Sequence, residues 1–278
     1  MRKVSVKIIE DKVKSLSIKV NTHLRPDVLS ALKKALRLET KTLARKALNA
    51  IIKNAEIAQE KSIAICQDTG LPVVFLELGA EVYIGQNITE IIINSVAQAY
   101  RQGCLRASLQ RDPILRQYKP EYKPAIVHTD IVNGGKIKIS LLPKGFGSEN
   151  KAQVKMFNPT SSWDEISDFI VQSVALAGAS ACPPYIIGIG IGGTQDFACL
   201  LAKKALLLPI DKKSNAKIAA METNLLQRIN KLKIGAMGLG GKITCLGIKI
   251  LTHPTHIAGL PAAVNISCHA LRSGSVVI

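Results

Sequence analysis

The order of the hydrophobic patterns along this chain is the feature that most limits its fold. Apolar residues recur at three- and four-residue steps from Asp27 to about Ser62, which predicts two amphipathic helices or one broken helix. Helical patterns also cover residues 88–104, 163–180, 194–207 and 213–233. Strands are expected at Ile126–Val132, Lys136–Leu142, Tyr185–Ile191 and Ile243–Leu251.

These segments do not alternate in the regular way that a doubly wound parallel sheet requires. They predict a mixed α/β (α+β) fold, with a mixed β-sheet packed by helices. The chain has 278 residues and no repeat or low-complexity linker. We therefore expect a single domain over residues 1–278, with a helical, basic N-terminal region (1–60) followed by the motif-bearing residues 62–272.

The charge of the chain is strongly positive, at +17, and much of the excess lies near the start. Residues 1–53 hold 14 Lys or Arg against 4 acids, at helical spacing, which is typical of a solvated helix face. Aromatic residues make up only 4% and do not interleave with the basic ones, so a base-stacking surface is not expected. We expect no nucleic-acid partner.

The N-terminal sequence lacks the charged-then-apolar order of a secretory signal. No uncharged apolar run reaches the roughly 18 residues that a membrane helix needs. A soluble, cytoplasmic protein is expected, without a membrane partner. In a reducing compartment its six cysteines are thiols or metal ligands rather than disulfides.

Three of these cysteines lie in sequence contexts that favour metal binding. Cys66 ends an apolar run before the turn-forming sequence Asp-Thr-Gly-Leu-Pro, so we expect its thiol at a strand-to-loop exit. Cys182 precedes two prolines that stiffen the chain, and Cys268 lies among polar residues close to the C-terminus. Each alone fits a buried thiol equally well, and only the three contexts together favour ligation.

Cys104, Cys199 and Cys245 are instead expected to be small buried hydrophobes. No Cys-x-x-Cys pair is present, which disfavours zinc ribbons and ferredoxin-type clusters. Three distant thiolates on a four-iron cluster would leave one iron without a protein ligand. That iron could bind a hydroxyl or water as a Lewis acid, which is hydro-lyase chemistry.

The glycine-rich segment 188–194 precedes a predicted helix, and its amides with the helix N-terminus could hold an anion. A dinucleotide fingerprint requires Gly-x-Gly-x-x-Gly, whereas here Gly188, Gly190 and Gly192 alternate. The pair Gly241-Lys242 is not a P-loop, because position 236 is alanine and position 243 is isoleucine.

Five segments together resemble the α subunit of class I fumarate hydratase and L(+)-tartrate dehydratase. They are residues 65–70, 105–108, 143–150, 182–184 with the glycine run, and 254–256 ahead of Cys268. The resemblance implies the N-terminal-domain fold of class I fumarases. It also implies a [4Fe-4S] cluster held by Cys66, Cys182 and Cys268, with one iron not ligated by protein.

The resemblance also implies a dicarboxylate site. The residues that match its substrate-binding positions are Gln67, Asp68, Arg106, Lys144, Gly145, Gly147 and His256, of which Asp68 and His256 are the candidate catalytic groups. From the residues alone, Asp68 could instead fix its turn and His256 could be a structural loop histidine. Arg106 could be a solvated charge on a helix, and Lys144 could belong to a solvated loop.

The implied activity is reversible hydration of a C4 dicarboxylate, fumarate to L-malate, or the corresponding dehydration of L(+)-tartrate. The family requires a further C-terminal region with substrate-binding residues and a base. We expect a β subunit to supply it, in an α2β2 heterotetramer. The alternatives are a non-catalytic iron–sulfur or anion-binding regulatory protein and, more distantly, a basic nucleic-acid binder.

Overall fold

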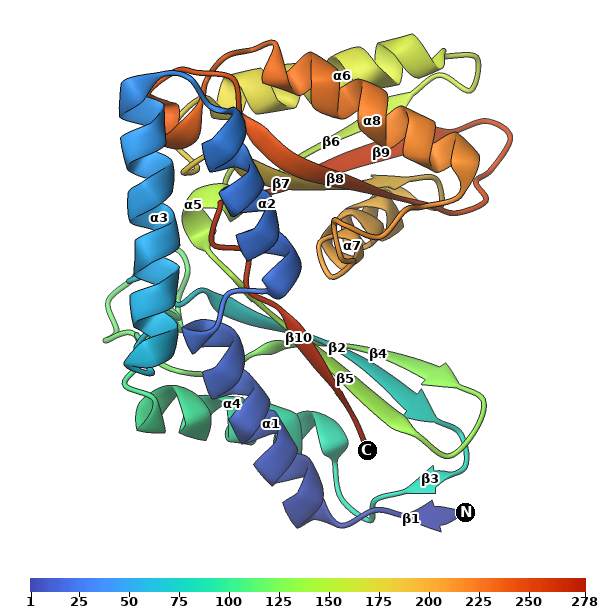
Figure 1. Ribbon diagram of the computed structural model, residues 1–278. Coiled ribbons are helices and arrows are strands. Elements are labelled where there is room, and N and C mark those ends of the chain that lie inside the picture. Colours follow the sequence, from blue (N-terminus) through green and yellow to red (C-terminus); the bar gives the residue numbers. More distant parts are fainter. The chain divides into compact units, whose positions relative to one another are not determined.

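The computed structural model describes residues 1–278 and has a mixed α/β fold, which confirms the predicted class (Figure 1). The chain divides into two compact units. Unit 1 comprises Met1–Arg25, Ala55–Gly145 and Arg272–Ile278, and unit 2 comprises Pro26–Asn54 and Phe146–Leu271.

The sequence predicted one domain without an internal boundary, and it gave no sign of this division. The chain passes between the units at residues 25/26, 54/55, 145/146 and 271/272. One of these points lies inside a helix and the others lie in short connections between helices and strands, so no long linker marks any of them.

Unit 1 is built on a four-stranded mixed sheet in the order β10-β5-β2-β4, in which only β2 and β4 run parallel. Its elements are β1 (Arg2–Lys3), α1 (Val6–Thr22), β2 (Leu71–Gly79), β3 (Val82–Tyr83), α4 (Ile88–Gln102), β4 (Ile126–Val132), β5 (Ile137–Lys144) and β10 (Gly274–Val277). Helices α1 and α4 pack together, and α1 contacts β5 and β10. Their buried faces meet the sheet in a core that includes Ile9, Ile92, Leu76 and Ile139.

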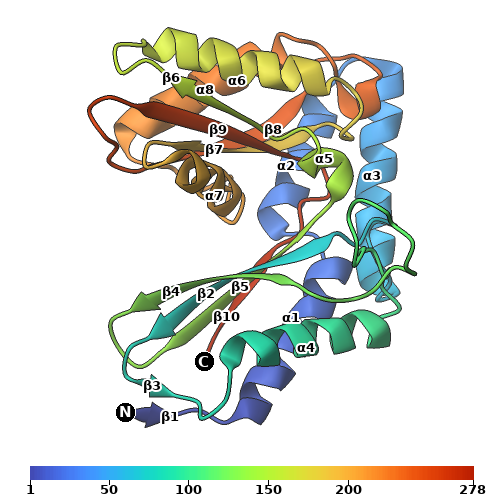
Figure 2. The ribbon, with the colours of Figure 1, turned by 180° about the vertical axis from the view of Figure 1, so that it is seen from behind.

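Unit 2 contains a second four-stranded mixed sheet, in the order β6-β9-β7-β8, with only β7 and β8 parallel. Its elements are α2 (Pro26–Leu38), α3 (Thr42–Glu60, whose last residues belong to unit 1), α5 (Phe146–Glu149), β6 (Gln153–Phe157), α6 (Trp163–Ala177), β7 (Tyr185–Ile191), α7 (Gln195–Ala205), α8 (Ala216–Asn230), a 3-10 turn (Ala236–Gly238), β8 (Cys245–Thr252) and β9 (Leu260–Ser267). Helices α6 and α8 cover one face of this sheet and α7 covers the other (Figures 1 and 2).

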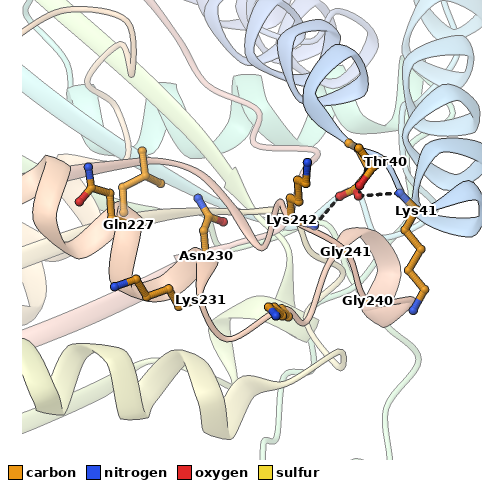
Figure 3. Close-up of a pocket in the computed structure, with 11 residues that line it drawn as sticks. Thr40, Lys41, Gln227, Asn230, Lys231, Gly240, Gly241 and Lys242 are labelled. Atoms are coloured by element: carbon orange, nitrogen blue, oxygen red, sulfur yellow. Dashed lines mark hydrogen bonds between the residues drawn. The ribbon is translucent and has the colours of Figure 1, made fainter.

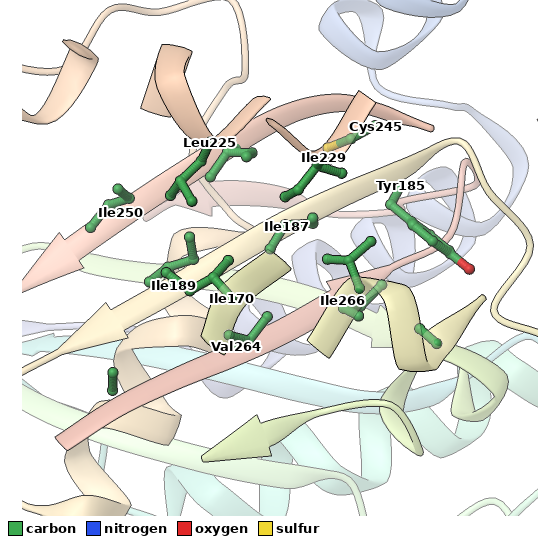
Figure 4. Close-up of a cluster of buried hydrophobic side chains, with 14 of the residues drawn as sticks. Ile170, Tyr185, Ile187, Ile189, Leu225, Ile229, Cys245, Ile250, Val264 and Ile266 are labelled. Carbon is green, nitrogen blue, oxygen red and sulfur yellow. The ribbon is translucent and has the colours of Figure 1, made fainter. Parts of the chain in front are cut away.

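The main core of unit 2 lies between its sheet and helices α6 and α8 (Figure 4). Ile170 of α6 and Leu225 of α8 pack there against Ile187, Ile189 and other strand residues. On the opposite face, α7 approaches β7 very closely. A Cβ atom on Gly188 would lie 2.1 Å from the Ala202 carbonyl oxygen, and one on Gly190 would lie 2.0 Å from that of Ala198. These two glycines therefore allow helix–sheet packing.

Several predicted elements agree closely with the structure. Strands β4 and β7 have the predicted bounds, and β5 and β8 are shifted by two residues or fewer. Helices α4 and α6 begin where side-chain caps are present: Asn87 accepts from the amides of Thr89 and Glu90, and Ser162 forms a capping box with Glu165. Helix α1 and strands β2, β6, β9 and β10 were not predicted. No helix combines the length and the apolarity required to cross a membrane.

Candidate functional site

In unit 1, the segment with Cys66, Gln67 and Asp68 is a loop between α3 and β2. The expected strand before Cys66 is absent: the apolar residues there anchor a loop, because the Ile65 amide donates to the Asn21 carbonyl (3.0 Å) and the Ile65 side chain is buried. Cys66 is half-buried, and Gln67 is exposed. The loop leads directly into β2, the second strand from one edge of the sheet.

Asp68 stabilises its own turn through its side chain, and its backbone carbonyl is bound by a distant arginine. Its Oδ1 accepts from the Gly70 amide (3.0 Å), which is the structural role considered from the sequence. Its backbone carbonyl accepts from Nη2 of Arg272 (2.7 Å). A Cβ atom on Gly145 would lie 3.2 Å from Asp68 Oδ2, so Gly145 stands directly against this carboxylate.

Arg272 is the largest buried group around this loop, at 2% exposure. Its Nη1 donates to Asn21 Oδ1 (3.3 Å), and its Nε has no hydrogen-bond partner. Asn21 in turn donates to the hydroxyl of Tyr100 (3.4 Å). A buried guanidinium is costly unless it is well paired, so this network fixes one arrangement of the loop.

Tyr100 continues the network to the next residue of the loop. Its hydroxyl donates to the Thr69 carbonyl (3.0 Å). Burial raises the pKa of Tyr100 to about 12, although the bond from Asn21 and the charge of Arg272 oppose this shift. The phenol therefore stays protonated and serves as a hydrogen-bond donor.

Thr69 connects the Asp68 loop to Arg106. Its Oγ1 accepts from the Arg106 amide (3.1 Å) and donates to the Arg106 carbonyl (3.4 Å). Arg106 was expected on a helix, but α4 ends at Gln102 and Cys104 adopts a φ of 52°, which the helix cannot continue through. The Arg106 side chain is exposed and makes no ion pair within the chain.

Lys144 does not belong to a solvated loop. It is the last residue of β5, is only 2% exposed, and its Nζ lies 3.4 Å from the Gly145 carbonyl oxygen. Gly147 falls in unit 2, in the short helix α5, and no atom lies within 4 Å of where its Cβ would be. Unit 1 therefore brings together Asp68, Arg106, Lys144 and Gly145.

Unit 2 brings Cys182 and Cys268 into one neighbourhood. Cys182 is exposed between α6 and β7, with a φ of 55° that is unusual for a non-glycine residue, and Cys268 is half-buried directly after β9. The amide and Nδ1 of His269 both approach the Cys182 carbonyl oxygen (3.3 and 3.0 Å). Burial raises the pKa of Tyr185 to about 12, and the charges of Cys182 and Cys268 add to that rise.

The donor chemistry of these residues suits an iron–sulfur cluster. All six cysteines are free thiols, and thiolate is the soft ligand that such clusters take. Two of the three predicted ligands lie together in unit 2, while Cys66 belongs to unit 1. No three His, Cys, Asp or Glu side chains form a group that could hold a single metal ion.

His256 lies in the exposed loop between β8 and β9, where its Nδ1 accepts from the Ala258 amide (3.1 Å). The loop role considered from the sequence is therefore present. In the glycine run nearby, the amides of Gly192 and Gly193 are not available to an anion, because they already donate to the carbonyls of Pro261 (2.9 Å) and Pro254 (3.1 Å).

The exposure of the remaining three cysteines differs from the prediction at two positions. Cys245 is buried, as expected, and burial raises the pKa of its thiol to about 12. Cys104 and Cys199 are exposed, so their assignment as buried hydrophobes was wrong. Cys104 follows the end of α4, and Cys199 lies on α7 beside Ala198, which is buried in a small cluster with Ala202 and Ala263.

Arg272, Asn21 and Tyr100 are site residues that sequence reasoning missed. Arg272 is the last residue of the predicted motif-bearing range 62–272, and no role was assigned to it. Its partners lie 204 and 251 residues away in sequence, and Asn21 and Tyr100 are 79 residues apart. No local pattern reports contacts over such separations. The four-residue spacing between Cys268 and Arg272 was the one available signal.

Comparison with known proteins shows the family of this chain. Residues 10–277 match the family described as fumarate hydratase (Fumerase). A protein of Methanocaldococcus jannaschii, named provisionally as an L(+)-tartrate dehydratase subunit alpha, is 39% identical over 95% of each chain. The L(+)-tartrate dehydratase subunit alpha of Escherichia coli O157:H7 is 26% identical over 96% of this chain and 89% of its own length, and that of Shigella sonnei is 25% identical over the same shares.

The family match covers both units and includes Cys66, Cys182 and Cys268, together with the whole Asp68–Arg272 network. This chain therefore belongs to the fumarate hydratase (Fumerase) family.

Proposed function

We propose that this chain is the α subunit of a [4Fe-4S]-dependent hydro-lyase that adds water to fumarate to give L-malate, and removes it in reverse. The hydro-lyase class follows from the family and from the names of the relatives. The observation that carries the proposal is the family match over residues 10–277, which includes all the cysteines and dicarboxylate-site residues predicted from the sequence.

Cys66, Cys182 and Cys268 would hold the cluster, with one iron free of protein ligands. When bound, this group supplies a Lewis acid for the hydroxyl that is added or removed. The free thiols and the shared neighbourhood of Cys182 and Cys268 support this ligand set.

The chain's own polar residues would bind and orient the substrate. Arg106 presents an exposed guanidinium with no internal ion pair, which can bind a substrate carboxylate through two parallel hydrogen bonds. Asp68 would hold or accept a proton at its carboxylate, next to Gly145 and Lys144. Gln67, Gly147 and His256 are proposed as further substrate contacts, and His256 as a second proton-transfer group.

The second candidate substrate is L(+)-tartrate, which is favoured by the names of the relatives. Tartrate carries a second hydroxyl group, so the two reactions differ in one polar contact. That contact would lie partly on residues that a β subunit brings.

The "subunit alpha" names of the relatives support a partner subunit, and we propose a β subunit in an α2β2 heterotetramer. It would supply the base that takes the C3 proton. We also propose a cytoplasmic location, because six unpaired cysteines suit a reducing compartment.

The test is an anaerobic assay of the assembled enzyme with fumarate, L-malate and L(+)-tartrate in separate reactions. Turnover of one of these by the heteromer, with almost none by this chain alone, is expected. Full turnover by the isolated chain would contradict the shared active site. A cluster-loaded heteromer that turns over none of the three would favour the regulatory alternative.

The ligand set is tested by Cys66→Ser, Cys182→Ser and Cys268→Ser under the same conditions. Each should abolish the visible absorbance of the cluster. Cys199→Ser is the matched control, because Cys199 is an exposed thiol in unit 2 that is not a proposed ligand. Equal loss in the control would show that the assignment is wrong.

A further inference from the structure

A cavity in unit 2, lined by none of the site residues assigned above, has the features of a binding site (Figure 3). Its volume is about 870 Å³, within the range typical of small-molecule pockets. It lies between the α2–α3 turn, the C-terminal end of α8 and the loop that precedes β8. The lining residues are Glu39, Thr40, Lys41, Leu226, Gln227, Asn230, Lys231, Lys233, Gly240, Gly241 and Lys242.

The walls of this cavity are fixed by hydrogen bonds within the chain. Glu39 is only 2% exposed, and its Oε1 accepts from the amides of Thr40 (2.8 Å) and Lys41 (3.0 Å). Its Oε2 accepts from the amides of Lys242 (2.7 Å) and Ile243 (3.3 Å), which joins the helix turn to the glycine loop. Two of these bonds are visible in Figure 3. The cavity is therefore formed before any ligand arrives.

Glycines allow the loop to come this close. Gly240 and Gly241 have φ values of 75° and 111°, and a Cβ atom on either would lie 2.5 Å from Lys41 Nζ or Glu39 Oε2, respectively. At the other end of the loop, Asn230 Oδ1 accepts from the amides of Thr244 (2.7 Å) and Cys245 (2.9 Å). Lys41 Nζ therefore lies close to the glycine loop at the cavity wall.

The charge of the cavity is unbalanced. Four lysines line it, Lys41, Lys231, Lys233 and Lys242, and none of them has an ion pair within the chain. The only acidic residue in the lining is Glu39, whose two oxygens are already occupied by four amides. All four lysines are exposed, and their combined positive charge at the cavity would attract an anion.

We propose that this cavity binds a phosphorylated small molecule of nucleotide size. All four cations are lysines and none is arginine, and lysine acts as a point charge toward phosphate, whereas planar carboxylate recognition favours the arginine fork. Leu226 and the methylene stems of the lysines offer an apolar surface for the organic part of the ligand. None of its lining residues is assigned to the proposed dicarboxylate chemistry, so the proposal does not depend on that chemistry.

The test is calorimetric titration of the full chain with ATP, with tripolyphosphate and with adenosine, at physiological salt concentration. We expect ATP to bind more tightly than tripolyphosphate and adenosine not to bind. The double variant Lys41→Ala/Lys242→Ala should weaken ATP binding about tenfold or more. The matched control is Lys7→Ala/Lys12→Ala, which removes the same charge from exposed positions of α1 in unit 1.

ATP binding that survives the cavity variant, or that falls equally in the control, would overturn the proposal in favour of general attraction to a basic chain. An absence of ATP binding, or tripolyphosphate binding as tightly as ATP, would also overturn it. The titration is repeated with the assembled heteromer. Loss of ATP binding there would identify the cavity as a subunit interface and reject the ligand site.

Discussion

The two units hold their candidate site residues by different physical means. In unit 1, the Asp68 loop is fixed by buried polar groups, namely Arg272, Asn21 and Tyr100. In unit 2, the segments with Cys182 and Cys268 adjoin strands β7 and β9, whose face toward α6 and α8 is packed by apolar side chains. A polar network is specific in direction and costly when broken, whereas an apolar core depends mainly on volume. The comparison predicts that unit 1 is sensitive to lost donors and unit 2 to added atoms.

Arg272→Met should have the largest effect, confined to unit 1. It leaves Asn21 Oδ1 and the Asp68 carbonyl without their donor, which should cost on the order of 3 kcal/mol. Hydrogen exchange should quicken at the Gly70 amide and its neighbours, and hydro-lyase turnover by the assembled enzyme should fall about 100-fold as the loop shifts. Arg272→Lys should keep part of the amide protection and part of the turnover that Arg272→Met loses.

The amides of unit 2 are the internal control for this variant. Unchanged exchange in β7 and β9 is expected. Equal acceleration in both units would mean that Arg272 supports the fold in general and does not position the loop.

Gly190→Ala should have the largest effect in unit 2. The added methyl group would meet the Ala198 carbonyl oxygen at 2.0 Å and force α7 away from β7, at a cost of about 1–3 kcal/mol. Denaturant unfolding measures this loss of stability. Gly259→Ala is the control in the same unit, since its Cβ would meet only a flexible methionine end at 3.8 Å. Unchanged stability of Gly190→Ala would show that the space between α7 and β7 does not limit their packing.

Glu39→Gln tests a polar anchor inside unit 2 and should make its stability less dependent on pH. Burial raises the pKa of Glu39, but the four amide hydrogen bonds outweigh this and lower it below its ordinary value of 4.5. The folded state therefore binds the proton less tightly than the unfolded state. The contribution is present above pH 4.5 and is lost as the pH falls through the lower, folded pKa.

The variant should be less stable than the parent by about 1–2 kcal/mol near pH 7, because a neutral amide accepts more weakly than a carboxylate and brings an extra donor. The difference should shrink in thermal unfolding experiments as the medium is acidified below pH 4.5. A difference that stays constant with pH would contradict the assigned role of the carboxylate.

Tyr100→Phe should have the smallest effect, about 1 kcal/mol, from the hydrogen bond to the Thr69 carbonyl. Tyr185→Phe is its counterpart in unit 2, because the Tyr185 hydroxyl also donates to a carbonyl, that of Gly178. Denaturant unfolding should show a similar loss of stability for the two variants. Only Tyr100→Phe should speed amide exchange at Arg106, which Thr69 holds through two hydrogen bonds.

Sequence patterns predicted elements that carry a complete local signal. Strand β7 and helices α4 and α6 were found because their periodicity and caps lie within a few residues. Strand β2 was missed because its run Leu71–Gly79 is buried over most of its length and does not alternate. Cys199 was misassigned because an apolar neighbourhood in sequence does not show which side of a helix faces the sheet.

The sequence by itself determined the mixed α/β class and the family, because residue types and local spacing carry that information, and its candidate site residues stay predictions. The tertiary structure alone decided the division into two units, the buried position of Lys144 and the roles of Arg272, Asn21 and Tyr100. It also brought the Glu39 carboxylate to the amide of Lys242, which lies 203 residues away in sequence. Such contacts depend on how the chain closes its long loops, which no short stretch of sequence encodes.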